Sequence, residues 1–322
     1  MFITNSELRA NASPQGDYSF AFKWGSEGNG NSQFLRPHDI DFDSIGNIYV
    51  SDRELNNIQK FTHDGKYLMQ WGKEGTGDGE FRTPYSIIID ASDNVYVVDR
   101  DNNRTQVFTS NGIFIKKFTA IGADSGDTFN RPEDIAINPS SGAIYVADTG
   151  NNRIVKFDST FNYVTKWGSK GSGTGEFDHP HGIGVDSSGN VYVNELKNPR
   201  IQKFDSTGRF IKQWGSEGRG EGEFTLPLEH LFVDHSDNIW QVDGEDNPRV
   251  QKFDNNGTFI TSVGTGPCII EDSVKKDPDR MAENHNCDGK FHQPEHANTD
   301  ISGNLYVVDR GNQRIEVFTP TK

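Results

Sequence analysis

Histidine, carboxylate and tyrosine side chains recur at one place in a repeated pattern, directly after a proline or its equivalent. The six copies read Pro37-His38-Asp39, Pro84-Tyr85-Ser86, Pro132-Glu133-Asp134, Pro180-His181-Gly182, Leu228-Glu229-His230 and Pro294-Glu295-His296. Imidazole and carboxylate groups gathered in a narrow space can hold a divalent metal ion such as Zn²⁺ or Ca²⁺. The alternative is a wet channel mouth that tolerates polar side chains and binds no ion.

These positions supply the candidate site residues. The candidate metal ligands are His38, Asp39, His181, Glu229, His230, Glu295 and His296. The candidate catalytic residues are Tyr85 and three arginines that each follow an aspartate, Arg53, Arg100 and Arg310. An arginine beside a carboxylate at the start of a loop is ordinarily a surface ion pair of little energetic value. In a protein of net charge −15 the three arginines are also suited to receive an anionic ligand. We expect no organic cofactor.

The elements that carry these residues repeat along the chain. An aspartate ends an apolar segment at Asp52, Asp99, Asp148, Asp243 and Asp309, with Asn194 taken as its equivalent, at intervals of 47, 49, 46, 49 and 66. Each unit has room for four short strands joined by tight turns. Six such units predict an all-β, six-bladed β-propeller of four-stranded antiparallel blades.

Two details support this fold class. The second strand of each unit, such as 95–98, is apolar at almost every residue, as a strand covered on both faces requires. The last unit lacks a fourth strand, and residues 18–25 supply a matching segment. We therefore expect an extension over 1–17 and one propeller over 18–322, in which the N-terminal strand completes the last blade and removes two open edges.

Four Gly-rich loops join one unit to the next. The segments WGSEGNGNSQF, WGKEGTGDGEF, WGSKGSGTGEF and WGSEGRGEGEF each span ten positions from Trp to Phe. A phosphate-binding loop would lead into a helix and end in Lys-Ser or Lys-Thr, and these loops do neither. We predict a structural role, with the Trp and Phe packed between blades.

The fifth and sixth units are separated by an insertion over 265–290 that contains both cysteines, Cys268 and Cys287. Two cysteines that close one long loop favour a disulfide, and hence a secreted, periplasmic or cell-surface protein whose leader is not part of this chain. A zinc site with His285 and His292 is the alternative, although its spacing fits no usual pattern. Because the insertion ends before Glu295, we expect it to cover the channel mouth as a lid, unless it packs on the outside of a blade.

The segments DRDNNRTQVF, DTGNNRIVKF and DRGNQRIEVF, together with PHGIGVDSSGNVYV, resemble NHL repeats, and the resemblance extends over residues 18–319. It implies a six-bladed propeller. It does not imply one function, because the family includes RNA-binding and protein-binding modules, a kinase sensor domain and the peptidyl-hydroxyglycine α-amidating lyase.

The resemblance to the amidating lyase is partial. That enzyme binds metal through histidines of Pro-His motifs, which His38 and His181 match, and Asp39 matches an acidic residue that follows one of them. It also uses an arginine from an Asp-Arg step like that of Arg53. The lyase takes three histidines from alternate blades, whereas His38 and His181 belong to units one and four.

Two function classes follow. The first is a metal-dependent lyase or hydrolase that acts on a small molecule or peptide in the central funnel. The second is a non-catalytic propeller that binds a protein, peptide or glycan. The net negative charge argues against binding to nucleic acid or to an anionic membrane surface. No apolar run is long enough to span a bilayer.

Overall fold

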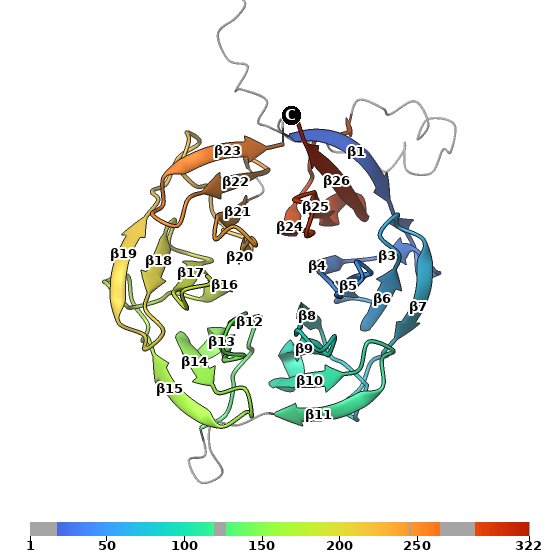
Figure 1. Cartoon of the computed structure of the whole chain (residues 1–322), viewed down its shortest axis with the longest axis horizontal. Coiled ribbons are helices and arrows are strands. Elements are labelled where there is room, and N and C mark those ends of the chain that lie inside the picture. Colours follow the sequence, from blue (N-terminus) through green and yellow to red (C-terminus); the bar gives the residue numbers. More distant parts are fainter. Residues whose placement is uncertain (1–17, 119–126, 245, 265–286, 322) are drawn as a thin grey trace, which may run out of the picture.

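The computed structural model describes residues 18–118, 127–244, 246–264 and 287–321. They form six antiparallel four-stranded sheets, or blades, arranged in a ring (Figure 1). In blades one to five the strands run in chain order from axis to rim. They are β4 (Pro37–Phe42), β5 (Ile48–Asp52), β6 (Asn57–Phe61) and β7 (Tyr67–Trp71); β8 (Pro84–Ile89), β9 (Val95–Asp99), β10 (Arg104–Phe108) and β11 (Phe114–Phe118); β12 (Asp134–Ile137), β13 (Ile144–Asp148), β14 (Arg153–Phe157) and β15 (Tyr163–Trp167); β16 (Pro180–Val185), β17 (Val191–Glu195), β18 (Ile201–Phe204) and β19 (Phe210–Trp214); and β20 (Leu231–Val233), β21 (Ile239–Asp243), β22 (Arg249–Phe253) and β23 (Phe259–Val263).

The sixth blade joins the two ends of the chain. Its order from axis to rim is β24 (Pro294–Thr299), β25 (Leu305–Asp309), β26 (Arg314–Pro320) and β1 (Tyr18–Trp24). β1 pairs antiparallel with β26, from Tyr18 opposite Pro320 to Trp24 opposite Ile315. The predicted six-bladed propeller and its closure by the N-terminal strand are therefore confirmed, as Figure 1 shows where β1 lies beside β26.

The second strand of every blade is buried along its whole length, as the near-continuous apolar pattern predicts. Each blade packs its apolar faces against the next blade. For example, Tyr49 of blade one packs in a cluster with Phe81, Val97 and Phe108 of blade two. The core is thus divided into apolar layers between blades, and this leaves the inner ends of the strands free to carry polar groups.

The Gly-rich loops are structural, as predicted. Phe81 at the end of the second loop is fully buried, and a Cβ added to Gly72 would lie 2.6 Å from its ring. The loop carbonyls point inward at an arginine of the same blade: Arg104 donates to the backbone oxygens of Thr76, Gly77 and Glu80 at 2.7–2.8 Å. A loop whose carbonyls converge on a guanidinium offers acceptors, not the N–H donors that a phosphate needs.

The repeat is shifted by one residue at one place in the fourth blade. Glu195, not Asn194, ends β17 and lies opposite Pro180, as Asp99 lies opposite Pro84. The Glu195 carboxylate accepts the Nε–H of Arg200 at 2.6 Å. The choice of Asn194 as the equivalent of the aspartates was wrong, because a glutamate performs the same structural role there.

Two expectations fall outside the described residues. Cys287 is buried, but Cys268 and most of the insertion over 265–290 lie in the segment 265–286, which the structure does not describe. The disulfide, the exported location inferred from it and the lid therefore stay predictions. Within the described ranges, no helix has the length and apolar character needed to cross a membrane.

Candidate functional site

The side chains that follow the proline, or its equivalent, at the start of each inner strand form one cluster near the axis. Ten polar residues there are each at most 8% exposed: His38, Asp39, Tyr85, Glu133, Asp134, His181, Glu229, His230, Glu295 and His296. The imidazole of His230 lies in the middle of this axial cluster, with its centroid 5.1 Å from that of His38, 4.3 Å from His181 and 5.3 Å from His296. The structure thus brings together the histidines and carboxylates that the repeat pattern singled out.

His38 and His181 are held in the same way on blades one and four. Each Nδ1 lies 3.0 Å from a backbone carbonyl oxygen of the following blade, that of Tyr85 for His38 and that of Leu228 for His181. Because a carbonyl can only accept, Nδ1 carries the proton and the neutral ring presents a lone pair at Nε2. Neither Nε2 has a hydrogen-bond partner among the residues that the structure describes.

Each of these Nε2 atoms faces a carboxylate. The distance is 3.4 Å from His38 Nε2 to Glu295 Oε2 and 3.8 Å from His181 Nε2 to Glu133 Oε2. Burial, followed by the charge of Arg53, lowers the pKa of His38 well below its ordinary value. Burial also lowers the pKa of His181 to about 4. Both imidazoles are therefore neutral at pH 7, and two facing acceptors leave a place between them for a proton or another cation.

Glu229 and Glu295 form a carboxyl pair in which the pKa values of the two groups are shifted in opposite directions. Burial, and then the charge of Glu295, raises the pKa of Glu229 well above its ordinary value. Burial also opposes ionisation of Glu295, but Arg310 and Arg53 together lower its pKa. Arg53 Nη2 lies 3.5 Å from Glu295 Oε1, and Arg310 Nε contacts the same oxygen. The proton of this pair therefore resides on Glu229 and the negative charge on Glu295, a division that suits acid and base roles.

The candidate arginines are part of this cluster and are not surface ion pairs. Their side chains are only 13–16% exposed. Arg100 Nε lies 2.7 Å from Glu133 Oε1 of the next blade. Asp99, which precedes Arg100, instead pairs with Arg104 at 2.7 Å. The surface interpretation was wrong because the aspartate of each step is bonded inside its own blade, which leaves the following arginine to reach a carboxylate near the axis.

Tyr85 lies between two of these guanidinium groups. The Cζ atoms of Arg53 and Arg100 lie 5.6 and 5.1 Å from the centre of its ring, and Arg53 Nη1 donates to the phenol oxygen at 3.3 Å. Burial raises the pKa of Tyr85 well above its ordinary value, so the phenol stays protonated. Its hydroxyl can therefore donate to a negatively charged oxygen.

Two aspartates of the cluster contact its other two histidines. Asp39 Oδ1 lies 2.7 Å from His296 Nδ1, and Asp134 Oδ2 lies 3.5 Å from His230 Nδ1. Each carboxylate also accepts a backbone N–H from a neighbouring blade. Burial alone would lower the pKa of His230, but the charge of Asp134 raises it above the ordinary value. These contacts hold the imidazoles of His230 and His296 in place between blades.

The seven predicted metal ligands all lie in the axial cluster. In the described part of the chain, however, no group of three or more His, Cys, Asp or Glu side chains is placed to hold a metal ion. Glu295 is paired with two arginines and Glu133 with one, so the carboxylates nearest the histidine Nε2 atoms are already bonded. Metal binding stays a prediction, and the chemistry proposed below does not depend on it.

Glu133 and Asp134 belong to the site but were not among the candidate residues. They follow Pro132 as His38 and Asp39 follow Pro37, and this equivalence was the available signal. Their importance lies in partners from other blades, since Glu133 meets Arg100 and His181 and Asp134 meets His230.

Comparison with known proteins supports the fold. An NHL repeat model matches residues 129–157, and a model of a 6-bladed beta-propeller family matches residues 34–104. Comparison with curated protein sequences finds no match.

Several solved structures have the same architecture. A virginiamycin B lyase from Staphylococcus aureus, with quinupristin, is 15% identical over 94% of this chain and 99% of that one, with a TM-score of 0.60. A gluconolactonase from Xanthomonas campestris is 14% identical over 90% and 88%, also with a TM-score of 0.60. A protein of unknown function from Bacteroides thetaiotaomicron is 15% identical over 94% and 75%, with a TM-score of 0.67. At these identities the likeness shows the fold alone.

Proposed function

We propose that this six-bladed β-propeller with NHL repeats is a lyase or hydrolase that uses acid–base chemistry in its axial cluster. One observation supports this function most directly. Two buried, neutral histidines each have Nδ1 fixed by a carbonyl, an Nε2 without a partner among the described residues, and a carboxylate opposite that Nε2. Each imidazole can therefore accept a proton at Nε2, and the carboxylate opposite stabilises the imidazolium that forms.

The proposed proton transfers use three groups. His38 Nε2 accepts a proton, from a C–H next to a carbonyl in an elimination or from water in a hydrolysis. The imidazolium that forms faces Glu295 Oε2, whose negative charge stabilises it. Glu229, whose pKa is raised well above its ordinary value, donates its proton to the leaving oxygen. His181 and Glu133 repeat the base and its carboxylate on the other side of the axis.

The arginines and Tyr85 suit a substrate that develops negative charge on oxygen. Arg53 and Arg100 flank the Tyr85 ring, and donors held in place in a buried site stabilise an oxyanion strongly. We propose a small carbonyl compound or a peptide as the ligand. Cyclic esters are the first class to try, because virginiamycin B lyase and gluconolactonase are among the structural neighbours.

The test is product formation from gluconolactone and quinupristin, followed by mass spectrometry. We expect His38→Gln and Glu229→Gln each to lower turnover by about a hundredfold or more, the usual contribution of a general base or acid. His63→Gln is the matched control, because its side chain is 57% exposed and belongs to a turn outside the cluster. Unchanged turnover in either cluster variant would contradict the assignment.

A non-catalytic binding propeller is the second candidate function. It is favoured by the pairing of Arg53, Arg100 and Arg310 with carboxylates, which leaves a charge-balanced surface at the axis. Calorimetry with the same compounds separates the two functions. Binding without any product, abolished by Arg100→Gln, would support recognition over catalysis.

A further inference from the structure

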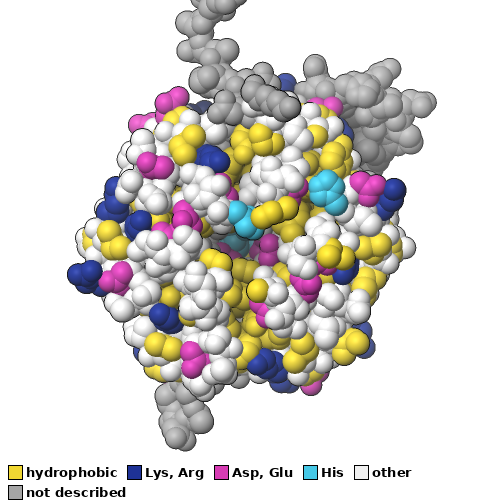
Figure 2. All heavy atoms as spheres, in the orientation of Figure 1, with side chains coloured by type: hydrophobic (Ala, Val, Ile, Leu, Met, Phe, Trp, Pro, Cys, Tyr) yellow, Lys and Arg dark blue, Asp and Glu magenta, His cyan; other side chains and the backbone are white. Residues whose placement is uncertain are grey.

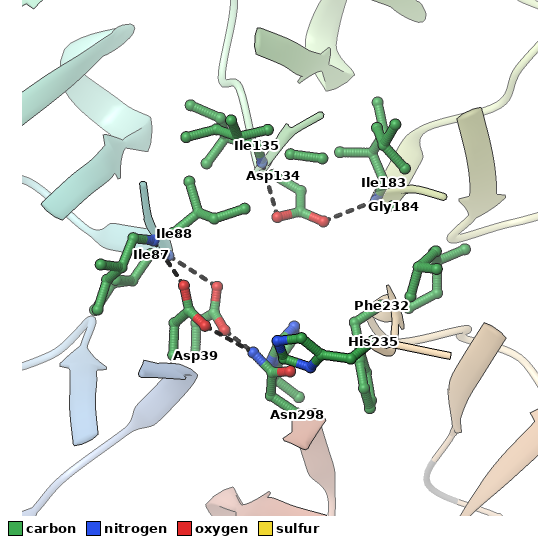
Figure 3. Close-up of a pocket in the computed structure, with 18 residues that line it drawn as sticks. Asp39, Ile87, Ile88, Asp134, Ile135, Ile183, Gly184, Phe232, His235 and Asn298 are labelled. Atoms are coloured by element: carbon green, nitrogen blue, oxygen red, sulfur yellow. Dashed lines mark hydrogen bonds and ion pairs between the residues drawn. The ribbon is translucent and has the colours of Figure 1, made fainter. Parts of the chain in front are cut away.

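The inner strands enclose a cavity of about 190 Å³ that the proposed chemistry does not use. Its walls come from the later residues of these strands, including 87–89, 135–137, 183–185 and 231–233, so it lies at the end of the axis opposite the arginines. Figure 2 shows a hollow at the centre of this face, where hydrophobic side chains surround acidic and histidine side chains. Figure 3 shows the cavity from the same side.

Apolar side chains form part of the wall. In Figure 3, Ile88, Ile135, Ile183 and Phe232 surround the space from four different blades. A cavity of about 150 Å³ lined by apolar side chains can bind a molecule the size of benzene. The axial cavity therefore has the size for a ligand with a six-membered hydrocarbon ring, and these four side chains offer that ring an apolar contact surface.

Asp41 differs from the other carboxylates in this wall. One carboxylate oxygen accepts a hydrogen bond from the backbone N–H of Ile89 at 2.6 Å, and the other accepts one from Nδ2 of Asn298 at 2.9 Å. No Lys, Arg or His side chain in the described ranges lies within ion-pair distance of it, whereas Asp39 and Asp134 in the same cavity have imidazole partners. Asp41 is therefore a partly buried carboxylate without a cation, and a charge withdrawn from water without a partner is costly.

The cavity opens into a wider depression of about 840 Å³ that shares Asp41 and Asn298 with it. Two isoleucines on the wall of this depression, Ile45 and Ile301, are 81% and 83% exposed. Exposed isoleucines that lead inward to a carboxylate without a cation match a ligand with a hydrocarbon body and a positively charged end.

We propose that this cavity binds a small organic ammonium ion, with its hydrocarbon part among the isoleucines and its ammonium group at Asp41. The ammonium supplies the missing counter-charge, and the hydrocarbon part removes apolar wall from water. The cavity adjoins the axial cluster and shares Asp39, Asp134 and His296 with it, but Asp41 itself is not part of that cluster.

The other titratable groups that face the cavity are Asp39, Asp134, His235 and His296. Asp39 and Asp134 are paired with imidazoles, so Asp41 is the carboxylate available to the ammonium group.

Isothermal titration calorimetry with benzylammonium chloride tests the site, with benzyl alcohol as the neutral probe of the same shape. At pH 8 we expect the whole chain to bind benzylammonium about tenfold or more tightly than benzyl alcohol, the value of one charge-assisted hydrogen bond. Asp41→Asn should abolish this preference. Glu74→Gln, which removes one exposed carboxylate and so changes the net charge equally, should leave it intact.

Three results would overturn the proposal: equal affinity for the two probes, no binding of benzylammonium at pH 8, or an unchanged preference in Asp41→Asn. If the Asp41→Asn chain does not fold, the unmodified chain still decides the question, because it must bind benzylammonium more tightly than benzyl alcohol.

Discussion

Replacing Glu295 by glutamine removes the anion on which the charge balance of the axial cluster depends. Glu295 is 3% exposed and pairs with Arg53 and Arg310, whose side chains are 16% and 13% exposed. Without it, two guanidinium groups remain largely buried beside a neutral amide. The neighbouring Glu229 is protonated because of burial and the Glu295 charge, so in the variant it can ionise and take over part of the pairing.

The magnitude follows from these contacts. Breaking a buried ion pair by removing one partner costs about 3–5 kcal/mol of unfolding free energy. Partial exposure of the arginines and the substitute carboxylate favour the lower end, about 3 kcal/mol for Glu295→Gln. The double variant with Glu229→Gln has no substitute anion and should lose about 5 kcal/mol. At roughly 2 °C per kcal/mol for a domain of this size, these losses are about 6 and 10 °C in Tm.

Urea unfolding at pH 7, followed by tryptophan fluorescence and by differential scanning calorimetry, measures both values. The control is Asp78→Asn, the same carboxylate-to-amide change at a surface pair. Lys117 Nζ lies 2.6 Å from Asp78, but the two side chains are 42% and 50% exposed, so the loss should stay below about 1 kcal/mol. A Glu295→Gln chain that melts within 2 °C of the unmodified chain, or a double variant no less stable than the single one, would refute this account of the cluster.

Burial raises the pKa of Glu229 above its ordinary 4.5, so above that pH the folded chain keeps a proton that the unfolded chain releases. Stability should therefore fall from pH 5 to pH 7, and Glu229→Gln should reduce this fall in urea unfolding at the two pH values. If the axial cluster binds Zn²⁺ or Ca²⁺, elemental analysis will find the metal and His181→Ala will weaken binding about tenfold or more; a metal-free chain whose Tm neither ion changes would refute metal binding. Intact mass with and without reductant, after thiol alkylation, should show a Cys268–Cys287 bridge, and two alkylated cysteines without reductant would exclude it. With a net charge of −15 the chain should not be retained on heparin at physiological salt, and retention would reopen nucleic-acid binding.

The fold could be predicted because its signals are local and repeated. Each blade repeats the same turns, apolar strands and Gly-rich loop, so an error in one copy is corrected by the others. The mistaken choice of Asn194 for Glu195 shows this, since it changed neither the number of blades nor their order. The closing strand was readable for a similar reason, because the last unit lacked one strand and the first had one in excess.

The sequence predicted which residue types gather at the site, but not how they pair. Sequence spacing placed the polar residues near the axis, but most of their partners come from another blade. Arg100 stands next to Asp99 in sequence and yet pairs with Glu133, 33 residues away. The Asp41 cavity depends on residues from separate blades in the same way. Protonation states follow from such pairings and from burial, and neither is visible in one strand.

The pairing of β1 with β26 also has a consequence during synthesis of the chain. Ser19 and Thr319, whose hydroxyls bond across this pair, are 300 residues apart. At a synthesis rate of roughly 5–20 residues per second, β1 leaves the ribosome about 15–60 s before its partner strand exists. During that time the segment Tyr18–Trp24, with four aromatic residues among seven, is an unpaired edge that other chains can join. β1 therefore stays unprotected until β26, made long after it, pairs with its edge.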